Sequence, residues 1–274
     1  MVVELCTASY AYSGAKTRQV EEVSFRLEAG TATALVGPSG AGKSTLLQGL
    51  QGFLRPVAGQ LLLGRRDPWR RGGRGLFGSI GTLLQDPGHQ LFAPTVKLDV
   101  AFGLRRLHLG AAESARKVTE ALGRVGLDPE VHGERSPWEL SGGEKRRAAL
   151  AGLLVTAPEV LLLDEPTAGL DAPSRRALFG DLERLVGQGT TVLWTSHDLE
   201  DVWSHAPRVL VLDQGRLVAD GPPTEVLADD ELAGRLGWDA LPVLAYARRW
   251  GVAPHADPEV LADRVEEAWR ARTL

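Results

Sequence analysis

The segment GPSGAGKST, residues 37–45, fits the pattern G-x-x-x-x-G-K-[ST] of a phosphate-binding loop. It follows an apolar run, TATALV (31–36), and opens a helix-like run, KSTLLQGL (43–50), as such a loop requires. Its glycines let backbone N–H groups approach phosphate oxygens, and a helix N-terminus favours anions. We therefore predict a nucleotide site formed by Gly37, Pro38, Ser39, Gly40, Ala41, Gly42, Lys43, Ser44 and Thr45.

Two side chains of this loop have specific expected roles. Lys43 would neutralise the β- and γ-phosphates, and Ser44 would place its hydroxyl on Mg²⁺. The loop therefore predicts a bound nucleotide together with Mg²⁺.

Further short apolar runs alternate with helical patterns, which is typical of an α/β layer fold with a mainly parallel sheet. The expected strands are 31–36, 80–84, 159–163, 190–195 and 208–212. Residues 97–150 indicate helices, and one of them is expected to pack a core stripe: Ala115, Val118, Leu122 and Val125. The break at 221–223, Gly-Pro-Pro, is expected to end the α/β part.

Composition limits the possible functions. The 274 residues contain 31 Lys and Arg against 35 Asp and Glu, for a net charge of −4, which gives no support to wholesale nucleic-acid binding. The lone Cys6 is read as a small apolar filler, with a reactive thiol as the alternative. No apolar run is long enough to span a bilayer, and the start lacks the basic region of a signal peptide. We expect a soluble, cytoplasmic chain that reaches membranes only through partners.

Two carboxylates follow the apolar run in VLLLDEP (160–166). Ligands bind at the C-terminal ends of strands in open α/β sheets. Asp164 is placed to hold Mg²⁺, and Glu165 to polarise an attacking water as general base. The alternative is a strand end whose acids only face solvent.

Two more polar residues end expected strands. His197 follows 190–195, and Gln85 follows 80–84. His197 is a catalytic candidate, and the Gln85 amide could coordinate Mg²⁺ or orient water. For both residues, an ordinary structural role at a strand end is the alternative.

The segment LSGGEKRR (140–147) resembles a second phosphate-binding turn, although it lacks the pattern of the first. Ser141 and Glu144 satisfy a helix capping box, which is the simpler interpretation. In the functional interpretation, the same helix start contacts the phosphates of a nucleotide held elsewhere. Asp171, in AGLDAPS, is similarly an ordinary helix cap or a functional residue.

Taken in order, these stretches and Gln85, Asp171 and His197 resemble the ATP-binding-cassette (ABC) ATPases over about residues 1–225. The resemblance implies a RecA-like, mainly parallel sheet with an antiparallel β subdomain and a helical subdomain at about 97–150. It also implies that Tyr12, in YAYSG, stacks on adenine, with Tyr10 as a rival.

The family resemblance also explains the second turn. ABC ATPase domains pair head to tail, so that the signature residues of one subunit cover the ATP of the other; these residues here are Ser141, Gly142, Gly143 and Glu144. Glu165 would then act as base, His197 would contact the γ-phosphate, and Asp171 would lie across the interface. A monomer is expected to be nearly inactive.

The stretch QDPGHQLFAPTVKLDVAFG (85–103) is similar to the energy-coupling-factor (ECF) group, which includes cobalt and nickel importer ATPases. This implies a transmembrane coupling protein that docks after Gln85, a separate membrane protein that captures a vitamin or metal ion, and a peripheral position on the cytoplasmic face. The tail, 226–274, resembles the C-terminal helical extension that adds to the dimer contact. The sequence departs from the group at 86–89, Asp-Pro-Gly-His, where His89 is read as a surface residue rather than a metal ligand.

Several alternatives remain open. The chain could serve a conventional ABC transporter, a non-transport ABC protein acting on DNA or ribosomes, or a regulatory module without turnover. The second ATPase subunit could be an identical copy or a related paralogue, and the transported substrate is not encoded in this chain. The loop GRRDPWRRGGRG (64–75) is read as a solvated loop, with anionic lipid or an acidic partner as the alternative.

Overall fold

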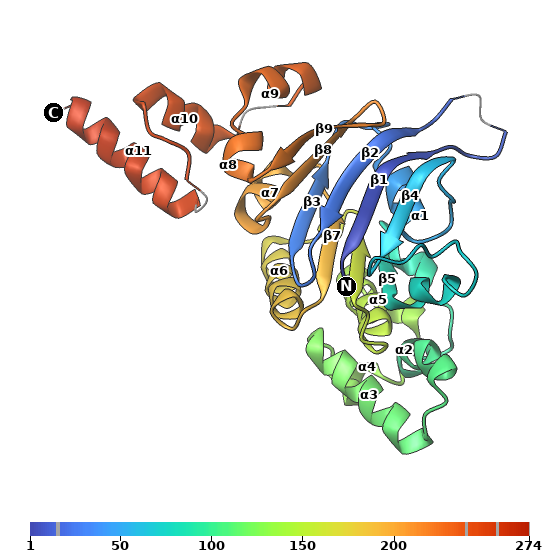
Figure 1. Ribbon diagram of the computed structural model, residues 1–274. Coiled ribbons are helices and arrows are strands. Elements are labelled where there is room, and N and C mark those ends of the chain that lie inside the picture. The colour runs from blue at the N-terminus through green and yellow to red at the C-terminus, as the bar shows by residue number, and fades with distance from the viewer. Residues whose placement is uncertain (15–16, 239–240, 256–257, 274) are drawn as a thin grey trace. The chain divides into compact units, whose positions relative to one another are not determined.

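A computed structural model describes residues 1–14, 17–238, 241–255 and 258–273 of the chain (Figure 1). The chain forms two compact units whose segments interleave in sequence. The first unit consists of Met1–Glu4, Arg26–Thr31 and Leu61–Trp194, and the second of Leu5–Phe25, Ala32–Gln60 and Thr195–Leu274.

The first unit is built on parallel strands in the order β5 (Ile80–Leu83), β6 (Val160–Leu163) and β7 (Thr191–Thr195). Every residue of β6 and β7 is buried, as expected for parallel strands covered on both faces. The N–H of Asp164 donates to the carbonyl of Leu83 (2.9 Å), so the carboxyl ends of β5 and β6 lie side by side.

The helices expected between residues 97 and 150 are present in this unit. They are α2 (Val96–Phe102), α3 (Ala111–Arg124), α4 (Pro129–His132) and α5 (Gly142–Leu154), followed after β6 by α6 (Ala172–Gly187). Short 3₁₀ turns η1 (Arg74–Ser79), η2 (Pro87–Gln90), η3 (Gly103–Leu107) and η4 (Pro137–Glu139) connect these elements.

The expected core stripe of α3 is partly wrong. Val118, Leu122 and Val125 are buried, but Ala115 is exposed. The first two turns of α3 contain no buried residue, so the packed part of the helix begins at Val118 and leaves Ala115 one turn outside it.

The second unit contains β3 (Ala32–Val36), parallel to β8 (Val209–Asp213), which pairs in turn with the antiparallel β9 (Arg216–Gly221). A further sheet has the order β2 (Val20–Leu27), β1 (Val3–Tyr10), β4 (Ala58–Leu63), and each of its strands has residues in both units. All five expected strands are present, and the predicted fold class is confirmed.

The second unit also contains α1 (Lys43–Leu50), α7 (Leu199–His205), α8 (Pro223–Val226), α9 (Asp230–Leu236), α10 (Pro242–Trp250) and α11 (Pro258–Thr273). Helices α10 and α11 pack together, with Leu244, Ala247 and Leu261 buried. The expected C-terminal extension includes five residues outside the described ones: Asp239, Ala240, Ala256, Asp257 and Leu274. None of the described helices is long and apolar enough to cross a membrane.

Helix α1, which follows the phosphate-binding loop, packs against a tyrosine of β1. A Cβ atom on Gly49 would lie 2.5 Å from Cε1 and Cζ of the fully buried Tyr10. The position therefore requires glycine for packing reasons.

Gly49→Ala is accordingly expected to lower the free energy of unfolding by about 1–3 kcal/mol, as overpacked cores do. Gly234→Ala in α9 is the matched control, because no described atom lies within 4 Å of its added Cβ. This control should stabilise the chain by about 0.5–1 kcal/mol through helix propensity. Denaturant unfolding measures both changes, and equal stability of the two variants would contradict the packing argument.

Candidate functional site

The phosphate-binding loop lies in the second unit, between β3 and α1. Gly37, Gly40 and Gly42 have positive φ angles of 151°, 81° and 102°. A Cβ on Gly37 would lie 2.0 Å from the carbonyl oxygen of Leu212, so other residues are excluded there. Helix α1 has no side-chain cap at its N-terminus, and Ser39 and Ser44 are exposed. The loop can therefore present backbone N–H groups to an anion.

Lys43 folds back over the same loop. Its Nζ donates to the carbonyl of Gly37 (2.7 Å) and to that of Pro38 (3.1 Å). The ammonium group is thereby held above the glycine backbone, where it can also contact a phosphate.

The two candidate tyrosines differ sharply in exposure. Tyr10 is fully buried, and burial raises the pKa of its hydroxyl well above the usual range. Tyr12 is 41% exposed, and its hydroxyl lies 3.2 Å from Thr45 Oγ1 and donates to Gln48 Oε1 (3.0 Å). Of the two, Tyr12 alone offers its ring to a ligand while bonded to helix α1.

The predicted carboxylates lie in the first unit, after β6. The Nε2 of Gln85 donates to Oε2 of Glu165 (3.1 Å), so two residues distant in sequence meet at this strand edge. Glu165 has a φ of 47°, and a non-glycine residue in the left-handed region costs about 1–3 kcal/mol. Such strain clusters at active sites.

A buried arginine that sequence reasoning missed ties this edge to α5. Arg146 is 7% exposed, and its guanidinium donates to the carbonyls of Ala168 (2.7 Å) and Gln85 (3.3 Å). Burial lowers its pKa, while the Asp86 carboxylate opposes this shift. The only signal in the sequence was its place as the middle residue of the basic run KRR (145–147). Such a run is equally typical of an exposed, charged helix surface.

Arg146→Met should lower the free energy of unfolding by about 1–3 kcal/mol, because two carbonyl acceptors lose their buried donor. Lys145→Met is the matched control at the preceding position. Lys145 has no side-chain partner among the described residues, and its replacement should leave stability nearly unchanged. Denaturant unfolding makes the comparison, and similar losses in both variants would remove Arg146 from this role.

The predicted capping box at the start of α5 is confirmed. Ser141 Oγ accepts from the N–H of Glu144 (3.3 Å), and Glu144 Oε2 accepts from the N–H of Ser141 (2.8 Å). These bonds to Ser141, helped by His132 and Arg135, lower the pKa of Glu144. The Glu144 side chain therefore stabilises the start of helix α5.

Neither the backbone conformation nor the packing of the described chain requires glycine at the two glycine positions of this turn. Neither Gly142 nor Gly143 has a positive φ. No described atom lies within 4 Å of a Cβ built on Gly142, and for Gly143 the nearest is an Arg147 nitrogen at 3.6 Å. Packing within the described chain would therefore accept a Cβ atom at both positions.

Two further predicted residues are exposed. Asp171 caps α6 by accepting from the N–H of Ser174 (2.9 Å), and hydrogen bonds from Ser174 lower its pKa. His197 lies just beyond β7 in the second unit, followed by Asp198, which caps α7.

His89, for which metal binding was the alternative interpretation, lies at the surface, and its Nε2 is 3.7 Å from Oδ2 of Asp86. The described residues contain no group of three or more His, Cys, Asp or Glu able to hold a metal.

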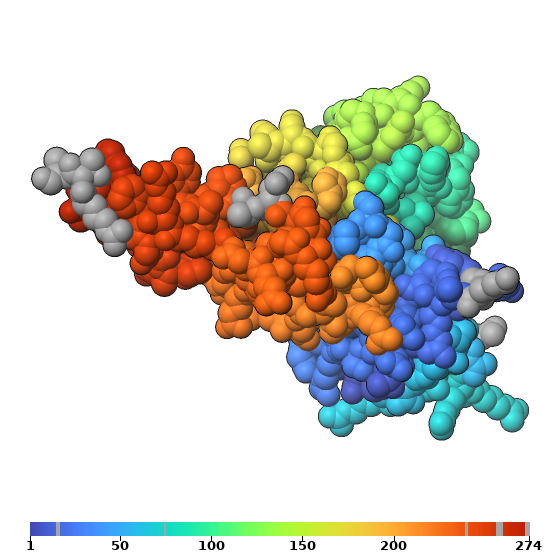
Figure 2. Space-filling view, turned by 90° about the horizontal axis from the view of Figure 1, so that it is seen from above, coloured from blue at the N-terminus to red at the C-terminus, as the bar shows by residue number. Residues whose placement is uncertain are grey.

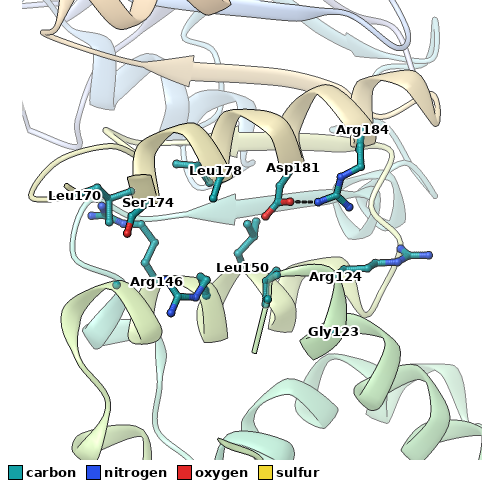
Figure 3. Close-up of a pocket in the computed structure, with 14 residues that line it drawn as sticks. Gly123, Arg124, Arg146, Leu150, Leu170, Ser174, Leu178, Asp181 and Arg184 are labelled. Atoms are coloured by element: carbon teal, nitrogen blue, oxygen red, sulfur yellow. Dashed lines mark hydrogen bonds and ion pairs between the residues drawn. The ribbon is translucent and has the colours of Figure 1, made fainter. Parts of the chain in front are cut away.

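A cavity of about 230 Å³ lies beside the signature helix α5, between it, α6 and the end of α3 (Figure 3). Arg124, Arg146, Arg147 and Arg184 contribute to its wall, together with Asp181. Asp181 pairs with Arg184, and burial raises the pKa of the aspartate. No sequence pattern indicated this cavity.

The predicted Mg²⁺ donors suit that ion chemically. They are the Ser44 hydroxyl in the second unit and, in the first, the Gln85 amide oxygen and the Asp164 carboxylate. Mg²⁺ prefers such oxygen ligands, and it takes only one or two from protein when phosphates supply others.

Comparisons with known proteins agree with the sequence resemblance. Residues 20–168 match the sequence profile of the ABC transporter family. The chain is 42% identical over 244 residues to the energy-coupling factor transporter ATP-binding protein EcfA2 of Symbiobacterium thermophilum, which covers 86% of this chain and 84% of that protein. It is 40% identical over 236 residues to EcfA of Methanothermobacter thermautotrophicus, covering 85% and 75%.

A solved structure gives the same result. CbiO1 from Clostridium perfringens, part of the ABC transporter complex CbiONQ, matches with a TM-score of 0.76 and 35% sequence identity, over 86% of this chain and 94% of that one. The predicted ATP binding and ATPase activity agree with these relatives. The chain therefore belongs to the ABC transporter family, as an ATP-hydrolysing subunit of the energy-coupling-factor type.

Proposed function

We propose that this chain powers import of a micronutrient, either a metal ion such as cobalt or a vitamin, through an ECF-type transporter. Two ATPase subunits pair head to tail, ATP binding closes the pair, and hydrolysis opens it. The chain sits peripherally on the cytoplasmic face of the membrane, bound to a transmembrane coupling protein. A separate membrane protein captures the cargo.

The observation that best supports the head-to-tail pairing is the pair of glycines at the start of α5. Gly142 and Gly143 are not required by backbone conformation or by packing among the described residues. A close approach by another molecule explains them, because glycine lets a backbone come near a ligand. We assign that ligand as the ATP of the facing subunit, contacted also by Ser141.

Within each catalytic site, we assign Glu165 as the general base that polarises water, with Gln85 orienting its carboxylate. His197 contacts the γ-phosphate, and Lys43 neutralises the β- and γ-phosphates. Asp171 lies across the subunit interface. Ser44, Gln85 and Asp164 would hold Mg²⁺, which neutralises developing phosphate charge when bound.

Adenine recognition is assigned to Tyr12. Its exposed ring is anchored through its hydroxyl to Thr45 and Gln48 of the loop helix α1. Tyr10 is buried against Gly49 and has no face to offer.

The docking surface for the coupling protein is assigned to the segment after Gln85. Phe92, Leu98, Phe102 and Leu107 are large apolar residues that stay exposed in this segment. The rings of Phe92 and Phe102 meet edge to face, with centroids 4.8 Å apart. Exposed apolar residues gathered in this way are typical of a protein interaction site.

This surface is connected to the catalytic carboxylate within the first unit. Buried Asp99 Oδ2 accepts from the N–H groups of Phe92 and Ala93 (2.7 Å each), which fixes the start of the surface. Gln85, at the other end of the same connection, donates to Glu165. We propose that movement of a docked partner reaches the base through this segment.

The C-terminal extension, assigned to residues 226–274, is proposed as an additional dimer contact beyond the nucleotide-binding domain of residues 1–225. Its helices α10 and α11 keep Tyr246 and Trp269 exposed, although Leu244 and Ala247 of α10 are buried. Such aromatic side chains are common in subunit interfaces.

The test is purification of the tagged chain from mildly solubilised native membranes, with every co-purifying protein identified by mass. A coupling membrane protein together with a small substrate-capturing one is the expected result. It would also show whether the second ATPase is a copy or a paralogue. Recovery of paired permease domains alone would instead assign the chain to a conventional ABC transporter, and recovery of no membrane protein would overturn the proposal.

A further inference from the structure

Residues 64–75, here called the arginine loop, take no part in the proposed nucleotide site. The loop contains five arginines and one acid, Asp67, in a chain whose net charge is −4. It lies within the first unit, between β4 and β5. In Figure 2 the cyan side chains of this region stand out from the surface at the lower right.

The side chains of four of the five arginines are described, and they are largely unneutralised. Arg65, Arg66 and Arg71 are exposed, and their side chains have no ion-pair partner among the described residues. Arg70 lies 3.7 Å from Asp67, and both the distance and the exposure of Arg70 make this pair weak. The loop therefore presents concentrated positive charge to whatever faces it.

The loop is nevertheless built in a defined way. Leu63 and Arg66 form a bridge that brackets a turn, in which Arg65 has a φ of 66°. Asp67 Oδ1 accepts from the N–H of Trp69 (2.8 Å), and the Trp69 ring meets Phe77 edge to face. A Cβ on Gly73 would lie 2.5 Å from the carbonyl oxygen of Asp67. A loop selected only for solubility needs no such scaffold.

The exposed surface of the loop is formed by charged side chains and backbone, and no large apolar side chain among the described residues is exposed at its centre. The large apolar side chains of residues 64–79, Trp69, Leu76 and Phe77, are not among the exposed ones. A protein partner usually requires an apolar core within its interface. Binding to a layer of phosphate groups requires cationic side chains but no apolar core. Guanidinium groups suit this role because they bind phosphate bidentately.

We propose that the arginine loop binds the anionic phosphate headgroups of the membrane lipids. The inference rests on the proposed function only because that function places the chain at a membrane surface. The loop adds a lipid contact to the contact with the membrane protein, so the ATPase is held at the bilayer through two kinds of attraction.

The test compares binding of the full chain to vesicles of phosphatidylcholine alone and to vesicles of equal parts phosphatidylcholine and phosphatidylglycerol, by co-sedimentation at low salt. The chain is expected to bind only the anionic vesicles. This binding should weaken as the salt concentration rises. Each arginine at an anionic surface contributes about fivefold in affinity. Replacing Arg65, Arg66, Arg70 and Arg71 together by Gln should therefore weaken binding on the order of several hundredfold.

A matched control removes the same charge elsewhere on the surface, by replacing Arg26, Arg116, Arg216 and Arg235 with Gln. The control should bind anionic vesicles nearly as well as the parent. A second loop variant, with the four arginines changed to Lys, keeps the charge and should retain most of the binding, which guards against loss through misfolding.

Equal weakening by the loop variant and the control would overturn the proposal, as would failure of the parent to bind anionic vesicles. If vesicles are not bound but the Gln loop variant loses its co-purifying membrane proteins, the loop contacts an acidic protein instead, and the lipid proposal is wrong. Loop-dependent vesicle binding without any co-purifying transporter protein would support the lipid contact and reject the proposed transport function.

Discussion

Glu165→Gln is expected to abolish ATP turnover while leaving ATP binding intact. The amide keeps the shape of the carboxylate and can still accept the hydrogen bond that Gln85 donates (3.1 Å), so the local geometry survives. It cannot take a proton from water, and loss of a positioned base costs about 10²–10⁴-fold in rate. Because hydrolysis reopens the pair, the variant should accumulate as a closed, ATP-bound dimer.

Steady-state phosphate release and size-exclusion chromatography with ATP measure the two effects. Glu130→Gln is the matched control, because this exposed glutamate of α4 has no side-chain partner among the described residues. It should turn over ATP as the parent does. A Glu165 variant that keeps more than a few per cent of the parent rate would remove Glu165 from the role of base.

Ser141→Arg should eliminate turnover without weakening nucleotide binding to the isolated subunit. Ser141 is exposed at the start of α5, beside two glycines that leave the helix end open. A long cation there would prevent this turn from covering the ATP of a facing subunit. The phosphate-binding loop of the same chain is untouched, so binding of a fluorescent nucleotide to the monomer should not change.

Loss of the helix cap is separated from this effect by Ser141→Ala. Both variants lose the hydroxyl that accepts from the N–H of Glu144, at a cost of about 0.5–2 kcal/mol in stability. The Ala variant adds no bulk and should therefore keep much more turnover than the Arg variant. Weaker nucleotide binding by the Ser141→Arg monomer would contradict action on the partner's ATP.

The parallel strands could be predicted from the sequence because their burial on both faces leaves continuous apolar runs. Strand β6, VLLL, is buried at every position, and its pattern is visible without a neighbour. Strand β2 interrupts its buried residues with exposed ones, and β9 has no buried residue, so no residue ranges were predicted for them. The sheet that contains β2, in the order β2-β1-β4, was expected only through family resemblance.

The site was predictable where chemistry needs a fixed local pattern, and hidden where it needs a distant contact. The glycines of the phosphate loop are dictated by positive φ within a few residues. By contrast, Arg146 contacts Gln85, 61 positions away in sequence, and nothing in the run KRR distinguishes it from its neighbours. The exposure of Ala115 was missed for a related reason, since helical periodicity gives a face but not the length over which that face is packed.

In the proposed mechanism, each complete ATP site combines the phosphate loop of one subunit with the signature turn of another. The most direct measurement mixes two variants that are each inactive alone, Lys43→Ala and Ser141→Arg, and follows phosphate release, with the parent chain supplying the reference rate. A mixed pair contains one intact site, formed by the loop of the Ser141→Arg chain and the turn of the Lys43→Ala chain. The mixture is expected to regain a substantial part of the parent turnover. A mixture as inactive as either variant alone, under conditions in which the parent turns over ATP, would contradict this mechanism.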